Sequence, residues 1–100
     1  MSLQNFRAFQ LAKGLYQETK KLKLRGELKD QLDRASLSIL LNLAEGSGKE
    51  SRKDRRRFYS MAFGSVREVQ AICLILGDER LAKCIDQVAA HTYKLLRALH

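Results

Sequence analysis

Apolar side chains recur at alternating intervals of three and four residues in four successive segments of the chain. This spacing is typical of helices that pack against one another at shallow angles. The 100 residues include no proline, which favours uninterrupted helices. One all-α domain over residues 1–100 is therefore predicted, an antiparallel up-and-down four-helix bundle. The expected helices span about 3–23, 27–45, 52–76 and 79–99.

Glycines separate the predicted helices. Gly26 and Gly77 interrupt the spacing, and Gly46-Ser47-Gly48 is expected to end the second helix through a left-handed backbone. Two further glycines, Gly14 and Gly64, fall inside helices, where close helix approach is the favoured explanation over a functional kink.

The start of the third helix has its own signals. Ser51 stands three residues before Asp54, a spacing that predicts an N-cap followed by an acidic first turn. Phe58 lies on the apolar stripe of this helix and is expected to point inward.

Two stretches, 37–44 and 71–76, are apolar nearly all the way round a helix. An outer helix of a small monomeric bundle needs one polar face, and 100 residues are too few to surround two such helices. A second copy of the chain is therefore expected to cover them, in a ring-like homo-oligomer. The candidate interface residues are Leu37, Leu41, Leu74 and Ile75.

Positive charge predominates: 19 Lys and Arg against 11 Asp and Glu give a formal charge of +8, which attracts polyanions. The densest basic run covers residues 49–57. It is a candidate binding site for nucleic acid, and the alternative is that it is only a solvated face of the protein. Tyr16 and Tyr59 could stack on bases, but packing at the rim of the core is the preferred interpretation. The candidate nucleic-acid-binding residues are Lys49, Arg52, Lys53, Arg55 and Arg56. A second basic patch comprises Lys20, Lys21, Lys23, Arg25 and Lys29.

No pattern of catalytic residues is present, so no enzymatic activity, cofactor or metal is predicted. Gly48-Lys49 lacks the remaining residues of a phosphate-binding loop. Two Cys and two His at these spacings do not make a zinc site. With no apolar run of membrane-spanning length and no signal-peptide pattern, a cytoplasmic location is expected. Cys73 and Cys84 are then expected as free thiols.

Residues 33–48 resemble the signature of the bacterial four-helix bundle family, also called the 23S ribosomal RNA intervening-sequence proteins. The signature positions Asn42, Ala44, Glu45, Gly46 and Gly48 fall in one unbroken string. Residues 51–68 are similar to the third helix of that family. The chain departs from the pattern twice, with Leu40 in place of the usual proline and Asp33 where relatives often carry arginine.

The resemblance implies a pentameric ring with basic surfaces. A related group acts as the accessory protein of diversity-generating retroelements, so a reverse transcriptase is an implied partner. Carried over from the signature, Asn42 and Glu45 are polar motif positions, while Gly46 and Gly48 shape the turn; all four are interpreted as structural. Asn42 either fixes helix register or bonds to a neighbouring backbone group.

The resulting hypothesis is a non-enzymatic, oligomeric helical bundle that binds nucleic acid, with RNA or an RNA–protein complex as the expected ligand. Two alternatives remain open on the sequence. One is a scaffold for an acidic partner protein, such as an enzyme of nucleic-acid metabolism. The other is a genetic passenger without an assigned role.

Overall fold

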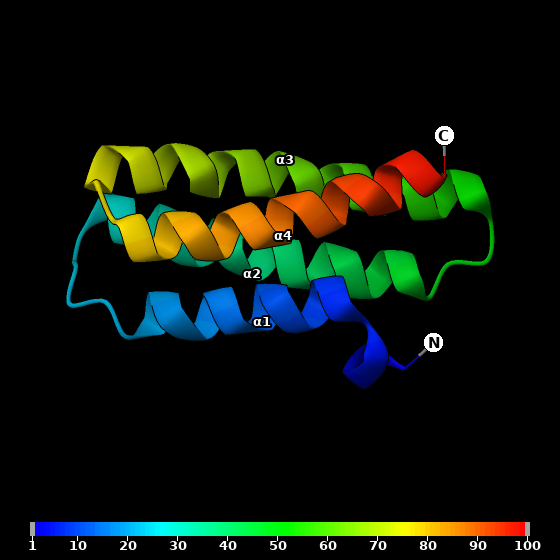
Figure 1. Ribbon diagram of the computed structural model, residues 1–100, viewed down its shortest axis with the longest axis horizontal. Coiled ribbons are helices and arrows are strands. Elements are labelled where there is room, and N and C mark those ends of the chain that lie inside the picture. Colours follow the sequence, from blue (N-terminus) through cyan, green and yellow to red (C-terminus); the bar gives the residue numbers. More distant parts are fainter. Residues whose placement is uncertain (1, 100) are drawn as a thin grey trace.

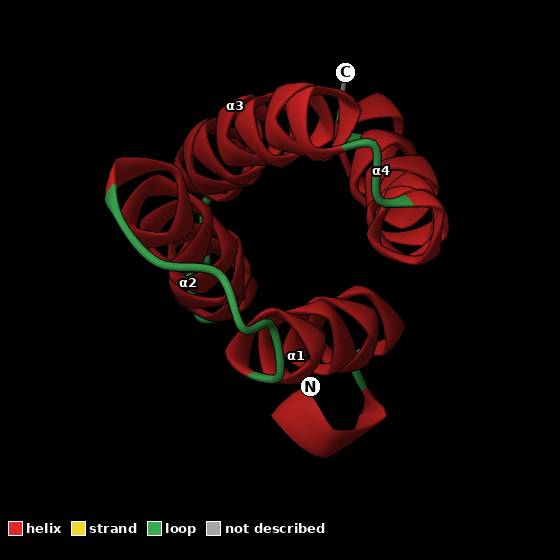
Figure 2. Ribbon diagram, turned by 90° about the vertical axis from the view of Figure 1, so that its left-hand side faces the viewer, coloured by secondary structure: helices red, strands yellow, loops and turns green. Residues whose placement is uncertain are grey.

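A computed structural model describes residues 2–99 as an all-α bundle with no strand in that range. The four helices are α1 (Arg7–Lys20), α2 (Glu27–Ser47), α3 (Arg52–Leu76) and α4 (Glu79–Ala98), preceded by the 3₁₀ turn η1 (Leu3–Asn5). Short connections alternate between the two ends of a molecule measuring 40 × 23 × 21 Å (Figure 1). Each helix packs against the next, and α4 returns to α1, which closes the core (Figure 2). None of these helices has the length and apolar content needed to span a bilayer.

The helix bounds differ from the expected ones mainly at the N-terminus. The first predicted helix, about 3–23, is instead a 3₁₀ turn, a break at Phe6 and a shorter α1. Phe6 has extended backbone angles and its ring is buried, so the break carries an aromatic side chain into the core. Gln10 Nε2 holds the turn in place by donating to the carbonyl oxygens of Leu3 (3.2 Å) and Gln4 (3.3 Å).

The core side chain at the start of α3 is Tyr59, and the prediction that Phe58 points inward was wrong. Tyr59 is buried, with its ring centroid 6.2 Å from that of Phe6. Phe58 is only partly buried, and its ring lies between two cations: the Arg57 guanidinium at 4.5 Å and Lys49 Nζ at 5.3 Å from the centroid. The inner stripe of α3 therefore begins one residue later than the sequence pattern indicated.

Glycine has a different role at each end of α2. Gly26, just before the helix, has φ 93°, a conformation that favours glycine. At the other end, the expected left-handed backbone is absent: Gly46 lies inside the helix and Gly48 has φ −90°. A Cβ on Gly46 would lie 2.6 Å from Cε1 of Tyr59 and 3.1 Å from Cβ of Phe58, so Gly46 permits the close approach of α3. Gly48 ends the helix without strain.

The two glycines within α1 and α3 do not mark close contacts. A Cβ added to Gly14 or to Gly64 meets nothing within 4 Å, so the expectation of close helix approach at these positions was wrong.

Gly46 and Gly64 differ in the space available for a Cβ, so alanine should have opposite effects on stability at the two positions. Gly46→Ala should lower the free energy of unfolding by about 1–3 kcal/mol, because the new methyl group overpacks against the buried Tyr59 ring. The higher helix propensity of alanine offsets part of this loss. Gly64→Ala, the matched control, should raise it by up to about 1 kcal/mol because space is available. Urea unfolding of both variants measures the two effects. A stabilised Gly46→Ala protein would contradict the tight packing of α2 on α3.

The two cysteines are free thiols, one buried and one at the edge of the core. Burial is the main cause that raises the pKa of Cys73 to about 11. This thiol is therefore protonated at neutral pH, and its role is packing.

Candidate nucleic-acid interface

The basic run of residues 49–57 lies where α2 connects to α3, and the C-terminal end of α4 lies beside it (Figure 1). The Ser51 hydroxyl accepts a hydrogen bond from the Asp54 backbone N–H (3.0 Å), which confirms the predicted N-cap. Arg52 Nη2 donates to the Ala98 carbonyl oxygen (3.3 Å), so α3 and α4 are joined at this end.

Three of the five candidate binding residues also make contacts within the protein. Arg55 is partly buried and donates from Nη2 to the Lys49 carbonyl oxygen (2.8 Å). Lys49 Nζ lies 3.4 Å from the Glu45 carboxylate, and Arg52 bonds the end of α4. These contacts hold the connection between α2 and α3, and they limit the reach of the three cations toward a ligand.

The other basic residues of the run meet on the outer side of α3. Lys53, Arg56 and Arg57 line a hollow of about 490 Å³ together with Asp54, Ser60 and Met61. They share a face because they are spaced three and four residues apart on one helix. Three positive charges thus lie around one carboxylate.

A second hollow, of about 290 Å³, lies between α3 and α4. Its lining residues are Arg56, Ser60, Tyr93, Leu96 and Arg97. Arg56 and Ser60 line both hollows, so the two form one continuous surface. We call the four cations of this surface the α3–α4 basic surface, which comprises Lys53, Arg56, Arg57 and Arg97.

Two members of the α3–α4 basic surface were not among the binding residues predicted from the sequence. Arg57 belongs to the basic run, and its spacing of four from Lys53 was the available signal. Arg97 lies 40 residues away in sequence from Arg57, and only the pairing of α3 with α4 brings them to one surface. The contiguous run was therefore an incomplete guide to the exposed charge.

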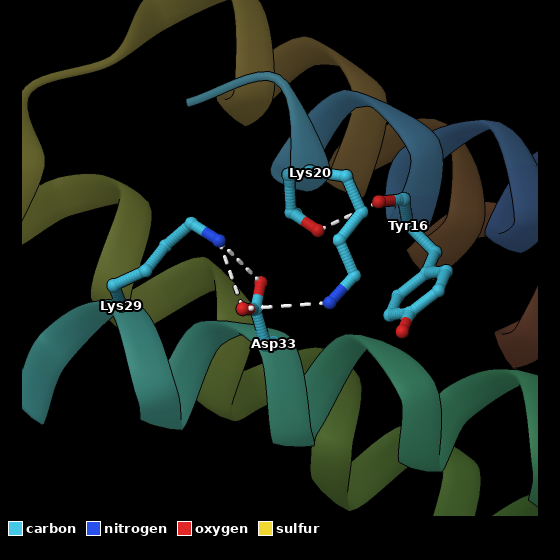
Figure 3. Close-up of polar contacts among 5 residues, drawn as sticks. Tyr16, Lys20, Lys29 and Asp33 are labelled. Carbon is cyan, nitrogen blue, oxygen red and sulfur yellow. Dashed lines mark hydrogen bonds and ion pairs between the residues drawn. The ribbon is translucent and has the colours of Figure 1, made fainter. Parts of the chain in front are cut away.

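The second basic patch lies at the opposite end of the bundle, where acidic side chains offset much of its charge. Asp33 forms ion pairs with Lys29 (2.8 Å) and Lys20 (3.6 Å), as Figure 3 shows. The Tyr16 side chain, and after it the Asp33 carboxylate, raise the pKa of Lys20. Glu18 pairs in turn with Lys21 at 3.7 Å. The remaining two residues of the patch, Lys23 and Arg25, are exposed on the link between α1 and α2.

The departure at position 33 thus has a local structural use. Asp33 supplies a carboxylate between α1 and α2 that two lysines share. The ion pairs are partly exposed, so their contribution to stability is modest.

The polar signature residues make local contacts. Asn42 Nδ2 donates to the Ser38 carbonyl oxygen (2.9 Å) and to its hydroxyl oxygen (3.1 Å), one turn earlier in α2. The same Ser38 hydroxyl oxygen accepts a hydrogen bond from the Ser65 hydroxyl (2.9 Å), which links α2 to α3. Of the two alternatives for Asn42, bonding to a nearby backbone group is the one observed. Glu45 is exposed and pairs with Lys49.

The four candidate interface residues are all at the surface but not in one place. Leu37 and Leu41, here called the α2 patch, are 38% and 58% exposed on the outer side of α2. Leu74 and Ile75, here called the α3 patch, are 82% and 70% exposed in the last turn of α3. Leu41 lines a hollow formed by the C-terminal half of α2 and the two residues that follow it, whereas Leu74 lines a groove between α3 and α4. The chain therefore carries two separate apolar patches.

Within residues 2–99, no group of three or more His, Cys, Asp or Glu side chains is placed to hold a metal ion. No curated protein matches the chain. The family model described as 23S rRNA-intervening sequence protein matches residues 5–99, which is nearly the whole chain. The four-helix bundle and the family match together show that the chain belongs to the 23S rRNA-intervening sequence protein family.

Proposed function

We propose that this protein binds RNA through the phosphate backbone, as a non-enzymatic helical bundle acting in the cytoplasm, and that the α3–α4 basic surface makes the contacts. The observation that carries the proposal is the gathering of Lys53, Arg56 and Arg57 around one hollow, with Arg97 in the adjoining one. An arginine guanidinium makes two parallel bonds to a phosphate, which suits such a ligand. The family name refers to 23S rRNA, which favours RNA over DNA.

The proposal includes self-assembly. The antiparallel up-and-down bundle forms a homopentameric ring, in which apolar surface exposed on one protomer is covered by the next. Support comes from the two exposed patches, since a head-to-tail contact joins two different surfaces of the same chain. A ring would present several copies of the α3–α4 basic surface to one RNA, so individually weak phosphate contacts would combine through avidity.

Salt-dependent binding tests the role of the basic surface. In the triple variant Lys53→Gln, Arg56→Gln, Arg57→Gln, three phosphate contacts are lost. The slope of log affinity against log salt concentration for a labelled RNA hairpin should then be shallower by about 2 or more, because fewer counterions are released. Fluorescence anisotropy at several salt concentrations measures this slope.

The control removes the same formal charge at the opposite end of the bundle, through Lys21→Gln, Lys23→Gln and Arg25→Gln. This variant should keep the slope of the unmodified protein. If the salt slope becomes shallower in the control and is unchanged in the triple variant of α3, the second basic patch is the RNA-binding surface and the proposal is wrong.

A further inference from the structure

We propose that Tyr93 is a stacking platform for an unpaired base, so that the preferred ligand is single-stranded RNA. This inference rests on the proposed function and specifies the substrate class of the same surface. Tyr93 is 50% exposed in the second half of α4, whereas Tyr59 is buried in the core. A half-exposed aromatic ring beside a basic surface is the combination that single-strand binding proteins use.

The surroundings of Tyr93 hold its ring at the wall of a hollow. On one side it packs against Phe63, with ring centroids 6.1 Å apart and an interplanar angle of 45°. The Arg97 guanidinium lies 5.9 Å from the Tyr93 centroid, one helical turn further along α4. Leu96 adds an apolar wall to the same hollow, and Arg56 and Ser60 line it from α3. The hollow thus combines aromatic, apolar and cationic groups, which suit the face of a base and its phosphate.

The two hollows suggest how a strand would lie. Lys53, Arg56 and Arg57 line the first hollow, where phosphates are proposed to bind, and Arg56 also lines the second hollow with Tyr93. A strand whose phosphate contacts Arg56 could therefore place the adjoining base against Tyr93. A base within a duplex has both faces stacked on its neighbours, so it cannot use this platform. Stacking accepts any base, so little sequence preference is expected.

The test separates stacking from charge. Binding is measured by fluorescence anisotropy with three labelled probes: a uridine oligonucleotide of about 12 residues, an abasic RNA strand of the same length and charge, and an RNA duplex. The unmodified protein should bind the uridine strand more tightly than the abasic strand. Tyr93→Ala should weaken uridine binding by about 5-fold to 100-fold and leave abasic and duplex binding unchanged. Tyr93→Phe should bind as the unmodified protein does, because the aromatic face is kept.

A direct reporter is also possible because the chain has no tryptophan. Tyr93→Trp introduces a single indole, whose fluorescence should be quenched by the uridine strand and not by the abasic strand. Circular dichroism of the variants checks that the helices are intact, so that a folding defect is separated from a loss of stacking.

The outcomes distinguish this inference from the function on which it rests. Equal binding of the uridine and abasic strands, or equal weakening of both by Tyr93→Ala, would overturn the stacking platform and leave phosphate binding standing. Absence of binding to all three probes at low salt would overturn both proposals. A duplex preferred over the uridine strand would overturn the assignment of single-stranded RNA.

Discussion

Leu43→Ala should lower the free energy of unfolding by about 2–5 kcal/mol, because it removes a fully buried leucine and leaves a cavity among helices that relax only partly. Leu43 is 0% exposed and belongs to the core cluster. Met61→Ala, on the outer side of α3, is the matched control: Met61 is 48% exposed, and its loss should change stability by about 0.5 kcal/mol or less.

Urea unfolding followed by circular dichroism measures both effects, at one protein concentration because the proposed self-association would contribute to apparent stability. The midpoint should shift for Leu43→Ala with little change in the slope of the transition. A loss below about 1 kcal/mol for Leu43→Ala, or a larger loss for Met61→Ala, would contradict the assignment of the inner and outer faces.

The spacing of apolar residues predicted the helical segments because burial on one face of a helix imposes that period. The stripe of α4 through Leu81, Ile85, Val88 and Thr92 is buried as the pattern predicts. In α3 the pattern failed locally, since adjacent aromatic residues at 58 and 59 fit the stripe about equally well. The choice of Tyr59 depends on Gly46 and Phe6, which come from other segments of the chain. Contacts between segments that are distant along the chain cannot be predicted from the spacing of residues within one segment.

For a similar reason, the sequence indicated only part of the exposed positive charge at the candidate nucleic-acid interface. The basic run correctly located charge at the start of α3, but a run of neighbours points in several directions around a helix. Lys49, Arg52 and Arg55 make contacts within the protein, whereas Arg97 reaches the surface from α4. The pairing of helices, and the backbone carbonyl groups that have no partner within a helix at its end, decide which cations face outward.

The exposed apolar residues of α2 and α3 were predicted from the two apolar stretches in the sequence, because a helix that is apolar all round cannot bury every side within a small bundle. Their arrangement in two patches adds information that the sequence did not carry. An interface with twofold symmetry brings one patch against itself, whereas a ring joins one patch to a different patch of the next subunit. Two separate patches on one protomer fit the second arrangement.

Leu41→Glu and Leu74→Glu should each convert the proposed ring into folded protomers of 11.4 kDa. A glutamate in either patch would place a charge in an apolar contact, at a cost that rises to several kcal/mol when the charge has no partner. Both side chains are more than half exposed in the protomer, so its own core should tolerate the change. Sedimentation velocity measures the assembly, and circular dichroism checks the helices. Gln87→Glu, at an exposed position of α4, adds the same charge outside both patches and should leave the ring intact.

Mixing the two variants separates a head-to-tail ring from a symmetric contact. The Leu41→Glu protein keeps an intact α3 patch, and the Leu74→Glu protein keeps an intact α2 patch, so an equal mixture can form one functional contact between unlike subunits. We expect this mixture to sediment as a heterodimer, while each variant alone sediments as a protomer. A mixture that stays fully monomeric would contradict direct pairing of the α2 patch with the α3 patch. Loss of helicity in either variant would place that leucine in the core of its own protomer, against the exposure observed here.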